Sequence, residues 1–224
     1  MPEGYDALIL GQLAAQAEQT ALLFIAPDDV RLANTRDCLA FFAPEVECLL
    51  IPAWDCLPYD RISPRNDLVS ERISSLVRLA TERNGPRVVL ATVNSLLQRV
   101  PPREAMARAT FTLHKGDELN LDDLFVYLEC NGFSRGGTVM EAGDYAVRGG
   151  IVDIFPPGSK MPVRLDLFGE TLEEIKTFDP VTQRREGALA SAQLVPVSEV
   201  VLNEASIARF CAGYRSKFGA VTDA

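Results

Sequence analysis

The residues that could bind nucleotide phosphates are few in this sequence. A phosphate-binding loop ends in Gly-Lys-Ser/Thr, because its backbone amides and its lysine together hold the phosphates. No Gly-Lys dipeptide occurs, and the stretch LAAQAEQT (13–20), where we expect such a loop ahead of the apolar run ALLFIA (21–26), has no glycine. All four lysines lie beyond residue 110: Lys115, Lys160, Lys176 and Lys217. We therefore exclude Walker-type ATPase chemistry in this chain and expect no cofactor.

Nucleophilic and metal chemistry also lacks suitable residues. His114 is the only histidine, so any Ser-His or Cys-His mechanism would have to use it. Its place in the run TFTLHKG (110–116) predicts an exposed strand position instead. The cysteines are widely spaced without a Cys-x-x-Cys pair, which predicts small buried hydrophobic residues in a reducing compartment. They are Cys38, Cys48, Cys56, Cys130 and Cys211. We assign no catalytic residue and no metal ligand.

Arginine and phenylalanine side chains are better candidates, for protein binding. If the run PVRLDLFGE (162–170) is a strand, its side chains alternate between two faces, so Arg164 and Phe168 share the face opposite the apolar residues. Arg148 stands beside a glycine pair that permits close backbone approach. Arginine with an exposed aromatic residue is the composition of a protein-protein hot spot. The three residues therefore form a candidate interaction surface.

A purely structural explanation of the same residues stays open at this point. Phe168 could cap a minor hydrophobic cluster, while Arg164 could pair with Asp166 or Glu170. Spacing along one strand does not distinguish this arrangement from an interaction surface.

The elements that position these residues fall into two groups, of which the first is α/β. Apolar runs that alternate with helices predict strands buried on both faces of an open parallel sheet, Rossmann-like or RecA-like in class. Asp28 and Asp29 stand where an N-cap and a first-turn acid belong. The expected elements are a helix over 4–19, a strand at 21–26, a helix to residue 42, a strand at 46–51, a loop over 52–67, a helix over 68–83 and a strand at 87–93.

The second group is α+β, with an antiparallel meander. A proline pair within residues 100–110 marks the boundary between the groups. Gly169-Glu170 has the length and composition of a two-residue hairpin turn. The expected elements are a strand at 110–116, a helix over 121–133, strands within 145–155, at 162–168 and at 171–178, and a helix from Asn203.

Composition and charge favour a globular protein with a protein partner. The 224 residues suit two domains, with 47% hydrophobic and 24% charged residues. No run of 18 uncharged apolar residues occurs, and Glu3 and Asp6 stand where a signal peptide needs basic residues, so we expect a cytoplasmic protein without membrane association. The net charge is −9, and residues 111–201, with 8 Lys/Arg and 15 Asp/Glu, carry −7. This acidic segment argues against nucleic acid as its main ligand.

Long stretches of the sequence resemble the N-terminal, UvrB-like region of bacterial transcription-repair coupling factors (Mfd). They are WDCLPYDRISPRNDLVSERISSL (54–76), GDYAVRGGIVDIFPPGS (143–159) and PVRLDLFGETLEEIKTFDPVTQR (162–184). The resemblance covers nearly the whole chain. It implies a degenerate RecA-like domain without a phosphate loop over residues 1–108, an inserted α+β domain that binds UvrA over 109–201, and the start of a truncated third segment over 202–224.

The resemblance implies a non-enzymatic recruitment module of transcription-coupled nucleotide excision repair, part of the N-terminal region of a longer protein. The family's UvrA-contacting positions fall on Arg148, Arg164 and Phe168. RNA polymerase, duplex DNA and ATP-dependent translocation would involve modules absent from this chain. UvrB itself fits less well, because UvrB-type proteins have an intact phosphate loop and a long DNA-clamping hairpin where this chain has the short loop 52–67.

Two alternatives to a recruitment module remain open from the sequence. One is a UvrB-like, damage-verifying ATPase with an unrecognised nucleotide site. The other is a purely structural domain pair that supports a translocase and has no affinity for UvrA.

Overall fold

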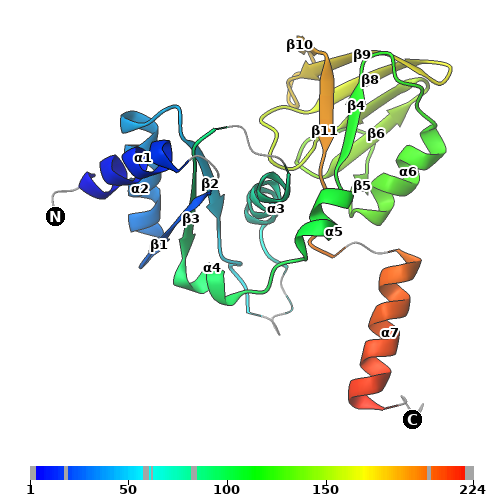
Figure 1. Cartoon of the computed structure of the whole chain (residues 1–224). Coiled ribbons are helices and arrows are strands. Elements are labelled where there is room, and N and C mark those ends of the chain that lie inside the picture. Colours follow the sequence, from blue (N-terminus) through cyan, green and yellow to red (C-terminus); the bar gives the residue numbers. More distant parts are fainter. Residues whose placement is uncertain are drawn as a thin grey trace. The chain divides into compact units, whose positions relative to one another are not determined.

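The computed structural model describes residues 4–17, 20–57, 61, 63–81, 85–200 and 203–219. The chain divides into two compact units, Met1–Thr110 and Phe111–Ala224, here called unit 1 and unit 2. Each unit has its own sheets and its own hydrophobic clusters (Figure 1).

Unit 1 is built on a parallel sheet of three strands in the order β1-β3-β2. Helices α1 and α2 pack against one face of this sheet, and α3 packs against the other (Figure 1). The predicted α/β class is confirmed. The elements are α1 (Tyr5–Gln16), β1 (Leu22–Ala26), α2 (Asp29–Phe42), β2 (Glu47–Ile51), α3 (Asn66–Ala80), β3 (Arg87–Thr92), α4 (Val93–Leu97) and α5 (Arg103–Arg108). Residues 18–19 and 82–83 of the predicted helices lie outside the described residues.

Burial of the unit 1 strands is less complete than the sequence predicts. Every residue of the central strand β3 is buried, as expected. In the edge strand β1, however, Leu23 and Ile25 are about half exposed. They share a face with Val89 and Ala91 of β3, but α3 packs on the β2 and β3 part of that face through Leu76 and Leu79. The expectation of strands buried on both faces is therefore wrong for β1.

Unit 2 is α+β, as predicted, with a six-stranded sheet in the order β10-β9-β8-β7-β6-β5 and a separate two-stranded sheet, β11-β4. Strands β6 to β10 form an antiparallel meander, and β5 pairs with β6 in parallel. The sequence did not predict β5, β10 and β11. The elements are β4 (Phe111–His114), α6 (Leu121–Cys130), β5 (Ser134–Arg135), β6 (Asp144–Arg148), β7 (Ile151–Ile154), β8 (Val163–Phe168), β9 (Thr171–Phe178), β10 (Arg185–Leu189), β11 (Ser191–Leu194) and α7 (Glu204–Phe218).

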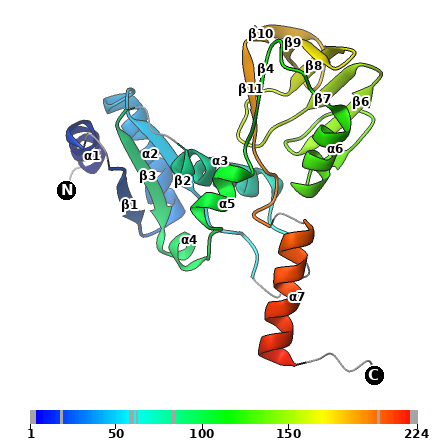
Figure 2. The same ribbon diagram turned by 45° about the vertical axis from the view of Figure 1, so that its right-hand side comes forward.

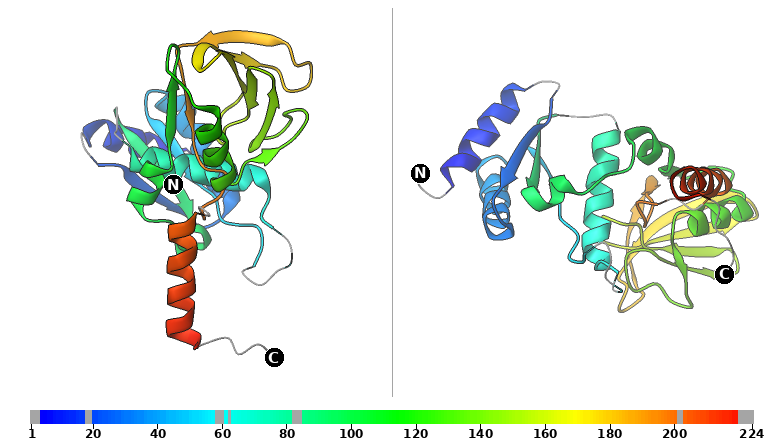
Figure 3. Two further views of the ribbon diagram at one scale, coloured as in Figure 1. Left: turned by 90° about the vertical axis from the view of Figure 1, so that its right-hand side faces the viewer. Right: turned by 90° about the horizontal axis from the view of Figure 1, so that it is seen from below.

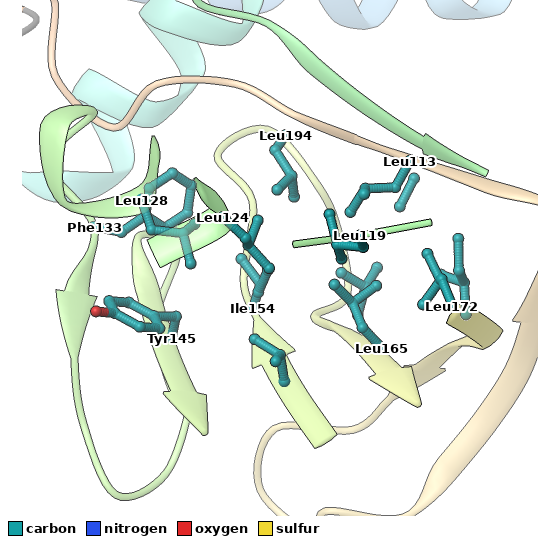
Figure 4. Close-up of a cluster of buried hydrophobic side chains, with 14 residues drawn as sticks. Leu113, Leu119, Leu124, Leu128, Phe133, Tyr145, Ile154, Leu165, Leu172 and Leu194 are labelled. Carbon is teal, nitrogen blue, oxygen red and sulfur yellow. The ribbon is translucent and has the colours of Figure 1, made fainter. Parts of the chain in front are cut away.

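The core of unit 2 lies between one face of the six-stranded sheet, helix α6 and the two-stranded sheet (Figure 2). Figure 4 shows Leu124 and Leu128 of α6 with Ile154 and Leu165 of the sheet, and Leu194 of β11 beside them. Helix α6 begins at Asn120, whose side chain accepts hydrogen bonds from the backbone N–H groups of Asp122 and Asp123. This cap fixes where the helix begins and so which residues face the sheet.

Two tight turns and one bulge fix the register of the meander. Gly149-Gly150 joins β6 to β7, and the predicted Gly169-Glu170 turn joins β8 to β9. Between Asp166 and Leu167 the paired residue on β9 changes from Glu174 to Leu172, which leaves Glu173 as an extra residue. This bulge lets Leu172 and Ile175, three positions apart, both reach the core, which strict alternation would forbid.

Helix α7 begins at the predicted residue, because Asn203 caps it and accepts a hydrogen bond from the backbone N–H of Ser206. None of its described residues is buried. Figure 3 shows α7, coloured orange to red, as one continuous helix. Within the described ranges, no helix is both long and apolar enough to cross a lipid bilayer.

The cysteines depart from expectation. None is fully buried: Cys211 is exposed, and the other four are partly buried. All five are free thiols.

Leu165→Ala should lower the free energy of unfolding by about 2–5 kcal/mol, because it leaves a cavity in the core of unit 2. Urea unfolding of the variant and the wild type measures the change. Phe168→Ala is the matched control on the same strand, since that side chain is exposed and its loss should cost less than about 0.5 kcal/mol. Equal losses in the two variants would contradict the assignment of faces to β8.

The Gly149-Gly150 turn predicts a second stability difference. Gly149 has φ +60°, so Gly149→Ala should cost about 1–2 kcal/mol. Gly150→Ala should cost about 1–3 kcal/mol for a different reason, because its Cβ would lie 2.7 Å from the backbone oxygen of Leu167.

Gly137 is the control for both turn variants. It has no positive φ and open space around its Cβ position, so Gly137→Ala should change stability by less than about 0.5 kcal/mol. The same urea titration ranks the three variants. Gly150→Ala as stable as Gly137→Ala would show that β6, β7 and β8 do not approach as described.

Candidate protein-binding surface

The face of the six-stranded sheet opposite the core carries most of the charged side chains of the meander. Cross-strand pairing aligns Arg148 with Ile151 and Ile151 with Asp166, and it aligns Asp153 with Arg164. Directly paired residues point to the same side of a sheet. We call this side the charged face, and it contains all three residues that the sequence singled out.

Phe168 is exposed on the charged face, as the strand pattern predicts. It is the last residue of β8, and 77% of its surface is accessible to solvent. The alternative in which it caps a hydrophobic cluster is therefore wrong. The backbone N–H of Leu167 donates to the oxygen of Gly150 over 2.8 Å, which brings this end of β8 next to the turn that follows Arg148.

The side chain of Arg164 is mostly covered. Its side chain is 15% exposed, and it pairs with Asp153 on β7 instead of Asp166 or Glu170. Its Nε donates to Oδ1 over 2.6 Å, and its Nη2 donates to Oδ2 over 2.8 Å. The hydrogen bond to Asp153 raises the pKa of Arg164 above its usual value. Its guanidinium carbon lies 4.6 Å from the centroid of the Phe178 ring.

Arg148 is the more accessible of the two arginines. Its side chain is 51% exposed, and its Nη2 lies 3.6 Å from Oδ2 of Asp153. Asp153, with 1% of its side chain exposed, thus stands between Arg148 and Arg164. Sequence reasoning missed Asp153, although an acid between the apolar residues Val152 and Ile154 was a signal that it needed a partner.

A second group of paired charges lies further along the same face. Lys176 donates to Asp166 over 2.7 Å and also pairs with Glu174. Hydrogen bonds to Asp166 and Glu174 raise the pKa of Lys176 above its usual value. Arg185 of β10 lies 3.7 Å from Asp166. The sequence analysis did not single out Lys176, because its partners come from a neighbouring strand and from the same strand two residues away.

The chemistry available on the charged face is recognition by charge and hydrogen bonding. Its arginines and lysine are ionised donors, and Phe168 adds an apolar contact. His114 is exposed on β4, as predicted, with its Nδ1 3.6 Å from Asp117. In the part of the chain that the structure describes, no three His, Cys, Asp or Glu side chains cluster as metal ligands would.

The turn between β1 and α2 is where a parallel α/β domain would hold a phosphate, because such loops follow a strand and precede a helix. Residues 13–16 of the stretch ahead of β1 belong to the end of α1. Here the turn contains Pro27 and Asp28. The Asp28 carboxylate accepts a hydrogen bond from the N–H of Arg31 over 2.7 Å, and Asp29 follows. Negative side chains thus occupy the helix N-terminus that would attract a phosphate.

Comparison with known proteins gives consistent matches. Residues 111–200 match the family model described as the UvrB interaction domain. The chain is 34% identical over 218 residues to the transcription-repair-coupling factor of Haemophilus influenzae, a match that covers 97% of this chain and 19% of that protein. Identity to the same factor is 33% over 204 residues in Escherichia coli (91% of this chain, 18% of that protein) and 36% over 196 residues in Myxococcus xanthus (84% and 16%).

The chain thus spans about a fifth of the length of these curated relatives. The resemblance recognised in the sequence is confirmed over nearly all of it. Residues 111–200 match the UvrB interaction domain, and the chain is homologous to part of the transcription-repair-coupling factors.

Proposed function

We propose that this chain is a non-enzymatic recruitment module of transcription-coupled nucleotide excision repair, and that it binds UvrA through the charged face of unit 2. The observation that carries the proposal is Phe168, exposed on the charged face of a UvrB interaction domain. Binding of UvrA would bring the excision machinery to RNA polymerase stalled at a DNA lesion.

Phe168 would supply the apolar part of this interface. Burying a phenylalanine side chain contributes about 1.5–3 kcal/mol, and Phe168 gains little of this in the free chain. It lies at the end of β8, so it would reach a partner without rearrangement of the sheet. An aromatic side chain of this kind, surrounded by polar groups, is typical of an interface hot spot.

The two arginines would supply directional hydrogen bonds to the partner. A guanidinium has five N–H donors in a planar fork, which suits carboxylate and carbonyl groups of a partner. Arg148 is half-exposed, and the turn that follows it lies next to the end of β8, whereas Arg164 is held by Asp153. Arg148 would therefore make the more extensive contact, and Arg164 a more restricted one.

The roles that we propose for the segments of the chain follow the family resemblance. Residues 1–108 would be a degenerate RecA-like scaffold, residues 109–201 the UvrA-binding domain, and residues 202–224 the start of a third segment. RNA polymerase, duplex DNA and ATP-driven translocation would involve parts of the longer relatives that this chain does not span. The protein would act in the cytoplasm.

A second candidate function is a UvrB-like, damage-verifying ATPase. The parallel sheet of unit 1, with helices that follow its strands, is the architecture on which many nucleotide sites are built. Asp28 argues against this function, because it caps α2 where a phosphate would bind.

Phe168→Ala and Arg148→Ala should each weaken UvrA binding by about 2 kcal/mol, as hot-spot truncations do. Titration of the purified chain with UvrA measures the affinity, and a thermal melt shows whether each variant is folded. Val181→Ala is the control, since Val181 is an exposed apolar residue in the β9–β10 loop, and its loss should leave the affinity unchanged. Wild-type chain without saturable UvrA binding would refute the proposed function.

Arg164→Ala should weaken UvrA binding as well, but it is a less clean test. Removal of the guanidinium leaves the Asp153 carboxylate buried with only the longer contact to Arg148, which should cost about 3–5 kcal/mol of stability. Its affinity is therefore interpretable only below its own melting transition.

ATP should neither bind nor be hydrolysed, because the chain has no Gly-Lys sequence and Asp28 and Asp29 oppose a phosphate at α2. Calorimetric titration to millimolar ATP with Mg²⁺, together with a phosphate-release assay, tests this. A saturable isotherm, or turnover above a buffer blank, would support the ATPase alternative instead.

A further inference from the structure

We propose that Asp153 is a positioning residue for the binding surface, which holds Arg164 and Arg148 in the orientation that UvrA binds. This inference rests on the proposed function. It concerns a residue that the partner would not touch, because 1% of the Asp153 side chain is exposed.

The first step is the burial of the Asp153 carboxylate. A buried carboxylate is stable only with hydrogen-bonding or charged partners. Both oxygens of Asp153 are used by Arg164, and Oδ2 is also the oxygen nearest to Arg148, at 3.6 Å. Two positive groups thus share one negative group, and the cluster has an excess of one positive charge on the charged face.

The second step is the fixed orientation of Arg164. Two parallel hydrogen bonds to Asp153 define the plane of the guanidinium, and the ring of Phe178 lies against it at 4.6 Å. The third nitrogen, Nη1, has no acceptor among the described residues, and it is not among the buried unpaired atoms. It therefore remains available to a partner in a single orientation.

The third step is the location of the cluster on the same face of the sheet as Phe168. Asp153 and Arg164 are paired across β7 and β8, and Phe168 lies four residues further along β8 on the same face. The turn after Arg148 contacts the same end of β8 through the Gly150 oxygen. An arginine that is already ordered loses less conformational entropy on binding, so Asp153 would increase affinity without contact.

Asp153→Asn tests the inference, because asparagine keeps the size and one acceptor oxygen but removes the charge and one of the two hydrogen bonds. We expect about a tenfold weaker affinity for UvrA, from two arginines that are no longer held. In a chain that also carries Arg148→Ala and Arg164→Ala, Asp153→Asn should change the affinity less than about twofold, because there is no arginine left to position.

Glu47→Gln is the matched control for loss of a carboxylate from an ion pair. Glu47 pairs with Arg87, which is almost fully buried, in unit 1. This variant should lower the melting temperature and leave UvrA affinity unchanged. Arg164→Lys is a second test if Asp153→Asn does not fold: it keeps the charge but cannot make two parallel hydrogen bonds, and it should also weaken binding about tenfold.

The outcomes separate this inference from the function on which it rests. Wild-type chain that fails to bind UvrA refutes both. Wild-type chain that binds, with folded Asp153→Asn or Arg164→Lys at wild-type affinity, refutes the positioning role alone. An equal loss of UvrA affinity from Asp153→Asn in chains with and without the two arginines would also refute it. The carboxylate would then affect binding without positioning an arginine.

Discussion

The alternation of side chains along β8 is the constraint on which unit 2 depends. Leu165 lies in the core, while Arg164 and Asp166 are paired on the opposite face. A shift of one residue in the pairing of this strand would exchange the two faces, burying charges in the core and exposing leucine. The turn at Gly169-Glu170 opposes that shift, because it allows only two residues between the paired ends of β8 and β9. The fold and the charged face are therefore specified together.

A buried ion pair on the face of a sheet carries a large desolvation cost. Replacement of such a pair by apolar residues often leaves stability unchanged or raises it, because two charges no longer have to be desolvated. Stability alone does not account for Asp153 and Arg164, since apolar side chains could pack against Phe178. Orientation of the arginines on the proposed binding surface would account for them. In unit 1, the charge at Asp28 has a local purpose, since it satisfies the free backbone N–H groups at the start of α2.

The sequence predicts those features that depend on neighbouring residues. The exposure of Phe168, the Gly169-Glu170 turn and the capping of α2 and α7 follow from alternation, turn composition and cap residues within a few positions. The partner of Arg164 cannot be predicted from neighbouring residues, because Asp153 is eleven residues away and contacts Arg164 only through the β7–β8 register.

Other differences have similar physical causes. The half-exposed β1 results from where α3 packs, which the apolar run itself does not encode. All five residues of β10 are exposed, and β11 has only four residues, so neither strand has the longer apolar pattern by which strands are recognised. The three candidate residues could be found in the sequence, while the pairing of two of them with Asp153 could not.

Strand β1 has a further consequence for how the protein behaves in concentrated solution. It pairs only with β3, so its outer edge offers backbone N–H and C=O groups to which no described strand is bonded, beside the exposed side chains of Leu23 and Ile25. Such an edge can pair with a strand of another molecule and start aggregation. The net charge of −9 opposes this by mutual repulsion. Because salt screens that repulsion, the colloidal stability of the chain depends on ionic strength even where its folding does not.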